Sequence, residues 1–338
     1  MKYIRTYGDY NSWKTDYSDP NRGFRLKPTL YKYSDVGVES KILLELDDPR
    51  KHGDSTYMEI TLGSDTEFSF YIGNKSGDTQ TTMTCTIDWG DGTVETKTIT
   101  ADDKGFKLAH SYVTGSYKIE LYGVERDYSI PGDSVYQCSL ISLTDSVKRV
   151  VLSNSVVSIG GEAFSGCSSL TSVYIPEGVT SIGVQAFGYC SSLTSINIPD
   201  SITSIGEFAF YGCSSLTSIN IPDSVTSIGV QAFGYCPSLV SVYISEGVTS
   251  IGDYTFSDCS SLTSINIPDS ITSIGEFAFY GCSSLTSISS LNTTAPTLGS
   301  NVFTNLPTNG TLYIKPGATG YDAWLNALPS GWKIVESL

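Results

Sequence analysis

The sequence has little positive charge. Of its 338 residues, 20 are Lys or Arg and 35 are Asp or Glu, so the formal net charge is −15. Between Val150 and Ile314 there is no Lys or Arg at all, whereas ten acidic residues fall there. Acidic surfaces without cations repel phosphate groups, so the sequence predicts no nucleic-acid partner and argues against an anionic membrane surface.

Long apolar runs are also missing. No stretch approaches the ~18 apolar residues of a membrane span, so we predict no membrane insertion. The amino terminus, "MKYIRTYGDYNSW", has no apolar h-region, and neither a signal peptide nor an anchor is visible. We therefore expect either a truncated chain or export and display by another route.

Motifs that carry catalysis or bind metals are absent as well. The sequence contains no G-x-S-x-G, no phosphate-binding glycine loop, no H-E-x-x-H and no C-x-x-C, and its two histidines are His52 and His110. The sequence does not exclude a Ser–His–Asp catalytic site. With many serines and only two histidines, however, a chance combination of these residues is the better explanation. We predict a protein that is not an enzyme and that has no cofactor and no metal site.

What the sequence does contain is a repeat. The letters "TSIG" recur every 23 residues, and the 29 residues 191–219 return letter for letter at 260–288, three periods later. The five copies of "TSIG" start at Thr180, Thr203, Thr226, Thr249 and Thr272. A fixed period of this length is typical of stacked repeats, in which each unit buries the apolar edge of its neighbour.

One period, "LTSINIPDSVTSIGVQAFGYCPS", starts at Leu216. Leu216, Ile219 and Ile221 follow L-x-x-I-x-I, the strand pattern of leucine-rich repeats, and Pro222 ends the strand because it cannot donate a ladder hydrogen bond. The segment "VQAFGYC" suits a short helical or 3-10 turn on the far side. The pattern therefore predicts a β-rich leucine-rich repeat solenoid with a parallel sheet on one side.

Cysteine follows the same period. Six of the eight cysteines occur once per repeat, at Cys167, Cys190, Cys213, Cys236, Cys259 and Cys282. Stacked turns would hold neighbouring Cβ atoms near the ~4.8 Å strand spacing, beyond the ~3.8 Å mean of a disulfide. We predict that these cysteines form one column of small buried side chains.

The repeat closes with "LYIKPGATGYDAW" and "GWKIV" and opens with a degenerate unit at Val147. This pattern closely resembles the BspA-like leucine-rich repeats of bacterial surface proteins over about residues 140–338. The resemblance implies a curved right-handed solenoid with a concave parallel sheet, no catalytic residues, and a displayed protein that binds extracellular ligands. A C-terminal cap from about residue 305 is expected to hold a helix at 321–328 and a strand at 332–335.

The residues before the repeats have a different sequence pattern. Short β-branched and aromatic runs between Tyr57 and Val124 predict an all-β sandwich. "IDWGDGT" from Ile87 and "HSYVTGSYKIELYG" from His110 resemble a PKD-type immunoglobulin-like domain over about 57–130, with Trp89 in its core. Asp88 and Asp91 are either turn-stabilising carboxylates, which we favour, or calcium ligands. The predicted domains are an unassigned segment at 1–56 with β character, a sandwich at 57–134 and the solenoid at 135–338.

Candidate binding residues point outward from the predicted strands. One column mixes aromatic rings with amides, which suits a glycan or peptide, although an ordinary solvated sheet face explains it too. Its ligand-binding candidates are Tyr174, Asn197, Asn220, Tyr243, Asn266 and Tyr313. A second column places one carboxylate per period after the strand, at Glu177, Asp200, Asp223, Glu246 and Asp269, where cation binding is open but not required.

These observations lead to one preferred function. We predict a non-enzymatic binding or adhesion protein, extracellular or at a bacterial surface, that uses the concave face of the solenoid for an extracellular protein or glycan. The alternative is a structural or receptor-binding component of an extracellular assembly such as a phage tail.

Overall fold

The computed structural model describes residues 25–32, 40–47, 56–62, 66–72, 82–100, 106–126, 138–139, 146–152, 156 and 158–337. The chain forms two units, residues 1–55 and 56–338. In the first unit, β1 (Arg25–Lys32) and β2 (Ser40–Asp47) pair antiparallel along their whole length. The remainder of the predicted N-terminal segment lies outside the described residues.

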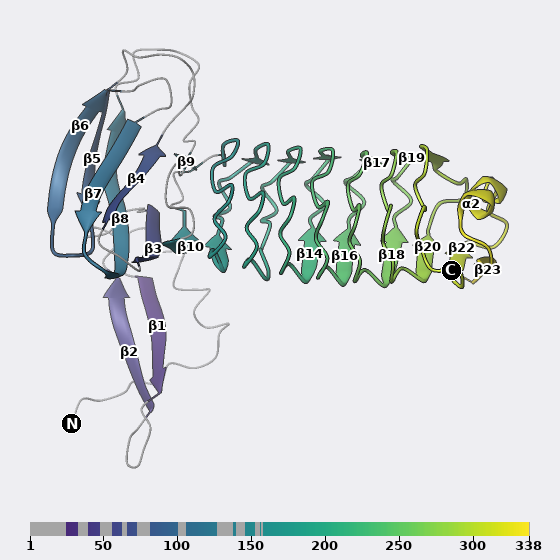
Figure 1. Ribbon diagram of the computed structural model, residues 1–338, viewed down its shortest axis with the longest axis horizontal. Coiled ribbons are helices and arrows are strands. Elements are labelled where there is room, and N and C mark those ends of the chain that lie inside the picture. The colour runs from purple at the N-terminus through teal and green to yellow at the C-terminus, as the bar shows by residue number, and fades with distance from the viewer. Residues whose placement is uncertain are drawn as a thin grey trace. The chain divides into compact units, whose positions relative to one another are not determined.

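The second unit begins with two antiparallel sheets (Figure 1). One contains β3 (Thr56–Leu62), β8 (Gly115–Arg126), β5 (Thr82–Asp88) and β6 (Val94–Thr100) in that order. The other contains β7 (Phe106–Tyr112), β4 (Thr66–Ile72) and β9 (Cys138–Ser139). Side chains from both sheets, among them Ile60, Ile87, Leu108 and Ile119, are buried together, as the alternating apolar pattern predicts.

Strand β10 (Val147–Val151) belongs both to this region and to the repeats. It pairs antiparallel with β3 and parallel with β11 (Ser172–Tyr174), so the first sheet reads β11-β10-β3-β8-β5-β6. Both β9 and β10 lie beyond residue 135, where the sequence analysis placed the domain boundary, and that boundary stays a prediction. The apolar skeleton of the degenerate first unit is buried, at Val150, Leu152, Val156, Ile159 and Phe164.

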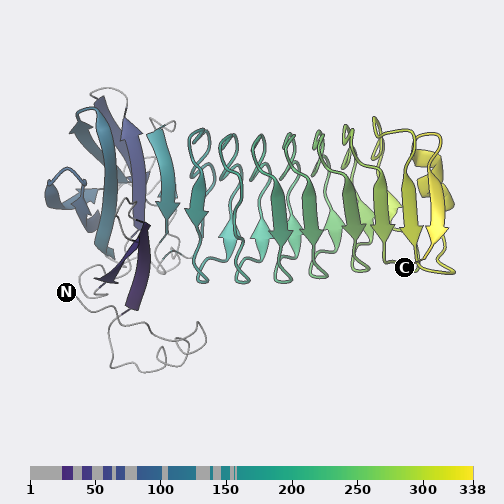
Figure 2. The ribbon, with the colours of Figure 1, turned by 90° about the horizontal axis from the view of Figure 1, so that it is seen from below.

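Most repeats contribute a strand to the first side of the solenoid, as predicted. These strands are β14 (Ser218–Ile221), β16 (Ser241–Ile244), β18 (Ser264–Ile267), β20 (Ser287–Ser290) and β22 (Thr311–Ile314). Their paired ladders are parallel and in register from one repeat to the next. Along β14, β16 and β18, exposed and buried residues alternate. Figure 2 shows the resulting stack of turns, which follows the 23-residue period of the sequence and confirms the predicted leucine-rich repeat solenoid.

A second side carries short parallel strands that the sequence analysis did not predict. They are β12 (Ser181–Ile182), β13 (Ser204–Ile205), β15 (Ser227–Ile228), β17 (Ser250–Ile251), β19 (Ser273–Ile274) and β21 (Thr297–Leu298). The threonine before three of these strands supports the stack, because its hydroxyl donates to the threonine carbonyl one turn earlier: Thr203 to Thr180 at 3.1 Å, Thr226 to Thr203 at 3.3 Å and Thr272 to Thr249 at 3.2 Å. This explains the recurring "TSIG".

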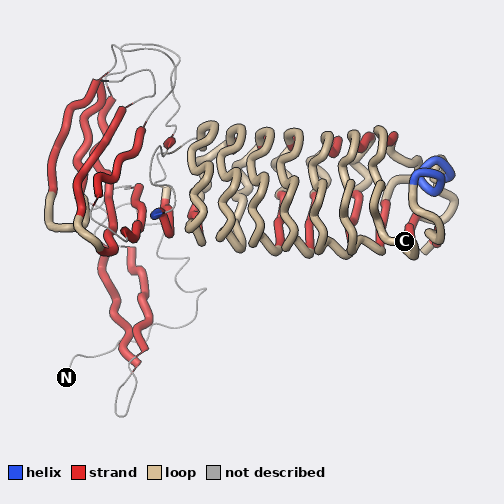
Figure 3. Tube along the Cα trace, in the orientation of Figure 1, coloured by secondary structure: helices blue, strands red, loops and turns tan. Residues whose placement is uncertain are grey.

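The third side consists of hydrogen-bonded turns in place of the expected short helical or 3-10 turns (Figure 3). In one repeat, the N–H groups of Gln185, Phe187 and Tyr189 donate to carbonyls of the following repeat, at 2.8, 2.8 and 2.6 Å. Gln185 and Tyr189 have positive φ angles, of 55° and 61°. With this backbone conformation, the N–H group of every second residue in the turn points toward the following repeat. A helix would direct its N–H groups along its own axis and leave the next repeat unsatisfied.

The core is a column of parallel rings. Phe164, Phe187, Phe210, Phe233, Phe256, Phe279 and Phe303 are buried, and consecutive ring centroids lie 5.2–6.2 Å apart. Trp324 covers the last ring, at 5.4 Å from Phe303, and comes from α2 (Asp322–Ala327). The final strand β23 (Lys333–Glu336) pairs with β22. The predicted C-terminal helix and strand are therefore present. None of the described helices is long and apolar enough to cross a membrane.

Candidate binding surface on the repeats

The predicted binding residues share one outward column on the first side of the solenoid. Tyr174 and Tyr243 are 54% and 57% exposed, among the most exposed large hydrophobic side chains of the described residues. Asn197, Asn220 and Asn266 are exposed too. The structure therefore presents rings and amides on one face, which can stack on an apolar ligand surface and exchange hydrogen bonds with it.

Register fixes how these side chains follow one another. Asn220 lies directly opposite Tyr243 in the β14–β16 ladder. Farther along, Asn266 faces Ser289, and Ser289 faces Tyr313. Tyr313 is only partly exposed, and it pairs with Val335 of the terminal strand. The column is thus continuous in register but less accessible at its C-terminal end.

One repeat departs from the predicted strand pattern. Residues 195–198 form no strand, although they have the same letters as β18. Their alternation of buried and exposed side chains persists, with Ile196 and Ile198 at 9% and 4% exposed. Asn197 therefore keeps its place on the outer face without ladder hydrogen bonds beneath it.

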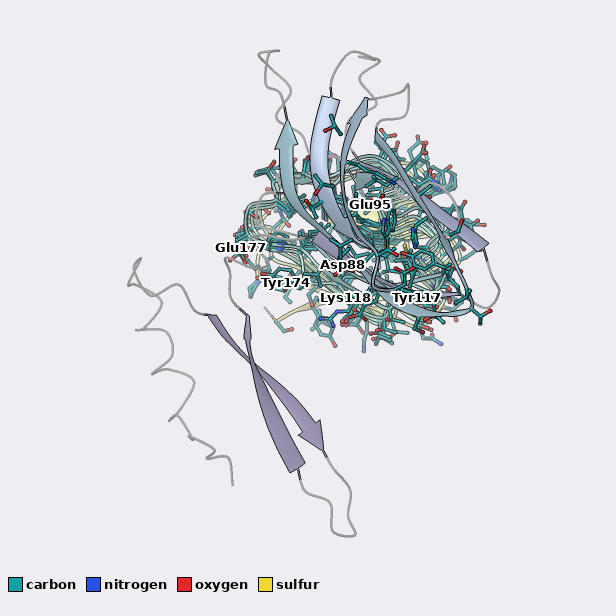
Figure 4. The ribbon with its side chains drawn as sticks, turned by 90° about the vertical axis from the view of Figure 1, so that its left-hand side faces the viewer. Asp88, Glu95, Tyr117, Lys118, Tyr174 and Glu177 are labelled. Carbon is teal, nitrogen blue, oxygen red and sulfur yellow. The ribbon has the colours of Figure 1, made fainter. Side chains whose placement is uncertain are left out.

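The acidic column lies at the exits of the same strands and is exposed at all five positions. Figure 4 shows Glu177 near Tyr174 at the periphery of the stack. Asp269 forms an ion pair with Lys315 at 3.7 Å, and Glu246 accepts the backbone N–H of Ser270 at 3.3 Å. Among the described residues, no group of three or more His, Cys, Asp or Glu side chains is arranged to hold a metal ion.

The third side carries aromatic residues that the sequence analysis missed, of which Tyr189 and Tyr235 are exposed and five others are partly exposed. We call them the turn-face aromatic ridge: Tyr189, Phe208, Tyr211, Tyr235, Tyr254, Phe277 and Tyr280. Tyr211 contacts both Tyr189 and Tyr235 at 5.3 Å between ring centroids, and Tyr254 stacks on Phe277 at 4.8 Å. The signal was present in the alternation of "FGYC" with "FYGC" between successive repeats.

The repeats match a known family model. Residues 134–263 and 249–318 match the BspA-type leucine-rich repeat region, in six copies. The chain belongs to this family. Leucine-rich repeat proteins generally bind proteins or other ligands, and the matches indicate no enzymatic family. No curated protein sequence matches this chain.

Solved structures similar to this BspA-type chain are also repeat proteins. A leucine-rich repeat protein from Bacteroides ovatus is 27% identical with a TM-score of 0.49, and the match covers 62% of this chain and 50% of that one. A leucine-rich repeat protein from T. pallidum is 28% identical with a TM-score of 0.49, covering 62% and 94%. A leucine-rich cell surface protein from Faecalibacterium prausnitzii is 23% identical with a TM-score of 0.29, covering 62% and 85%. This chain thus spans half the length of the Bacteroides protein.

The cysteine column of the BspA-type array is buried, and its six members carry thiols and not disulfides, as predicted. Each thiol from Cys190 onward also donates to a phenylalanine carbonyl of the preceding repeat, such as Cys190 to Phe164 at 3.1 Å and Cys213 to Phe187 at 3.2 Å. Burial raises the pKa of Cys190 to about 12. A thiol protonated at neutral pH is a poor nucleophile, so the column is structural.

The turn between β5 and β6 is held by its own side chains. Asp88 and Asp91 accept the backbone N–H groups of Gly90 and Thr93, each at 2.9 Å, as turn-stabilising carboxylates do. Asp91 also binds His110 Nε2 at 2.8 Å, and Trp89 stacks on His110 at 4.8 Å. Partial burial raises the pKa of Asp91, but the hydrogen bonds from His110 and Thr93 outweigh it and lower the pKa overall. Figure 4 shows Asp88 and Glu95 in this region. The PKD-type resemblance itself stays a prediction.

Proposed function

We propose that this chain is a non-enzymatic binding protein that acts outside the cell or at a bacterial surface. Its outward column on the first side of the solenoid, which we call the strand-side column (Tyr174, Asn197, Asn220, Tyr243, Asn266 and Tyr313), would bind an extracellular glycan or protein segment. The observation that carries the proposal is the pair Tyr174 and Tyr243, more than half exposed on one face. Large exposed rings on a rigid surface are frequent anchors in recognition.

The spacing of the column favours an extended ligand. Tyr174 and Tyr243 stand three repeats apart, which is about 14 Å at the ~4.8 Å spacing of strands. Asn197 and Asn220 lie on the two repeats between them and offer amide donors and acceptors. A ligand that stacks on both rings passes over both amides, so the column combines apolar contact with polar selection.

The experiment is a screen followed by a matched pair of variants. The full chain is screened against immobilised oligosaccharides and extracellular-matrix proteins, and affinities are measured for each hit. In the test variant, Tyr174→Asn and Tyr243→Asn are combined. Asn is the residue that Asn197, Asn220 and Asn266 already supply in this column, so the fold should tolerate it. The control variant combines Tyr189→Asn and Tyr235→Asn on the third side, where exposure is 53% and 50%.

Loss of two aromatic anchors should weaken binding of the hit at least ~30-fold, since an anchor often contributes at least ~2 kcal/mol and each 1.4 kcal/mol is tenfold. The control variant should bind within ~2-fold of the parent. Equal binding by the parent and the test variant would place the site elsewhere on the molecule.

A further inference from the structure

The turn-face aromatic ridge is built by an exchange of tyrosine and glycine between neighbouring repeats. Two successive positions precede each cysteine. They read Gly188-Tyr189 in one repeat, Tyr211-Gly212 in the next and Gly234-Tyr235 in the one after. Each ring thereby lies beside a glycine: a Cβ at Gly212 would meet Tyr189 Cδ1 at 3.0 Å, and one at Gly234 would meet Tyr211 Cδ2 at 3.3 Å. The rings of Tyr189, Tyr211 and Tyr235 therefore pack as a row across three repeats, and Tyr189 and Tyr235 are about half exposed.

Two backbone positions per turn hold side chains at positive φ, and several of them are aromatic. Tyr189 and Tyr235 have φ angles of 61° and 55°, where Gly166, Gly212 and Gly281 stand in other repeats. Phe208, Tyr254 and Phe277 take φ angles of 54–55° at the earlier position. Bulky side chains are costly in this region of φ. Rings therefore stand where glycine, glutamine or asparagine fits the same backbone in other repeats, so the backbone itself does not require them.

Carboxylates surround the ridge without a cation. Glu207, Asp253 and Glu276 precede the aromatic residues Phe208, Tyr254 and Phe277 and are exposed. Asp258 replaces the ring in the repeat after Tyr235 and forms a hydrogen bond with the Tyr235 side chain. No Lys or Arg occurs between Val150 and Ile314 to neutralise these charges. The surface thus combines exposed ring faces with uncompensated negative charge.

We propose that the turn-face aromatic ridge is a second binding surface, separate from the strand-side column, and that its occupant is an extended basic peptide segment rich in arginine. Guanidinium groups stack on tyrosine faces through cation–π contacts and donate planar pairs of hydrogen bonds to carboxylates. Charge complementarity also speeds the encounter of a basic partner with an acidic surface. An acidic partner or nucleic acid would be repelled.

The test uses labelled probe peptides of twelve residues that alternate Gly with Arg, Gly with Lys or Gly with Glu. Binding to the full chain is followed by fluorescence anisotropy at about 50 mM and about 150 mM salt. We expect saturable binding of the Gly–Arg peptide, severalfold weaker binding of the Gly–Lys peptide because lysine stacks less well, and none of the Gly–Glu peptide.

Variants separate the ridge from the general acidity of the chain. Tyr189→Asn with Tyr235→Asn should weaken binding of the Gly–Arg peptide at least ~10-fold, one decade of affinity. Asn305 already occupies this turn position at a φ of 66°, so the backbone accepts the change. The matched control, Tyr174→Asn with Tyr243→Asn, should bind within ~2-fold of the parent. Glu207→Gln with Asp258→Asn keeps every ring and should weaken binding at least ~5-fold, which preserves a readout if the ring variant fails to fold.

Three outcomes would overturn the proposal. The first is no saturable binding of the Gly–Arg peptide by the full chain. The second is equal affinity of the parent and both ridge variants, which would show a diffuse charge effect. The third is equal weakening by the ring variant and its strand-side control. The strand-side column is tested with different probes, so its failure would leave these results unaffected.

Discussion

The ring of Phe233 lies 2° from parallel to the ring of Phe210, with their centroids 5.2 Å apart. On its other side Phe256 lies at 5.6 Å. This packing predicts that Phe233→Ala lowers the free energy of unfolding by roughly 3–5 kcal/mol, because the substitution removes a buried ring together with its contacts to both neighbouring rings. Urea unfolding of the parent and the variant measures the change. The exposed control Val240→Ala should change stability by less than ~0.5 kcal/mol, and a small effect of Phe233→Ala would contradict the stacked core.

A second prediction concerns a close approach between repeats. A Cβ at Gly229 would meet the backbone of the preceding repeat, at 2.3 Å from Glu207 N, whereas one at Gly252, in the same column, would meet its nearest atom at 3.3 Å. Gly229→Ala should therefore destabilise the chain by at least about 2 kcal/mol, as overpacked interiors do. Gly252→Ala should cost clearly less. Thermal unfolding of both variants and the parent measures the two losses of stability. Equal losses for Gly229→Ala and Gly252→Ala would mean that the repeats are not stacked this closely.

Thiol reactivity tests the cysteine column. The six repeat cysteines are buried, and burial raises the pKa of Cys236 to about 12. In native protein at neutral pH they should react with a disulfide reagent only on the timescale of unfolding. In denaturant without reductant they should react at once, all six. Fewer than six reactive thiols from these positions, mapped by mass spectrometry, would show disulfides and contradict the column.

The same thiols predict a loss of stability in alkali. The ordinary pKa of 9.0 applies to the unfolded chain, and burial raises the pKa of Cys282 to about 12 in the folded state. A raised pKa contributes stability below pH 9, and this contribution is lost as the pH rises from 9 toward 12. The urea midpoint should therefore fall across this range. Tyrosines titrate nearby, so Cys282→Ala serves as the control: its midpoint should be lower at pH 7 but fall less steeply.

The 23-residue period was enough to predict most of the solenoid, because apolar letters recur where each turn must bury them. It did not predict the short second ladder or the inter-repeat hydrogen bonds of the turns. Those depend on φ angles such as that of Tyr189, and propensity offers no reason to place a tyrosine at positive φ. The limits of local sequence are clearest in residues 195–198, which share their letters with β18 yet form no strand. Since the letters are identical, the difference must come from the contacts that each segment makes with its neighbouring repeats.

The strand-side column followed from period-two alternation, so its members could be named from the sequence and are found on one face. The ridge could not be found that way, because its rings come from three different turn positions, as in Phe208, Tyr211 and Tyr235. Recognising it required knowing that side chains at all three positions lie on the same side of the solenoid. The sequence likewise did not predict that Asp91 bonds to His110 as well as to the N–H group of Thr93, because this contact depends on β7 lying beside the turn.

Hydrogen–deuterium exchange of the full chain, with and without a ligand obtained from the glycan and matrix-protein screen, tests the central claim most directly. Strand-side binding predicts slower exchange in β14 and β16, where Asn220 and Tyr243 face each other, with little change in residues 106–126. Protection confined to residues 106–126, or to the turns that carry Tyr189 and Tyr235, would contradict binding at the strand-side column.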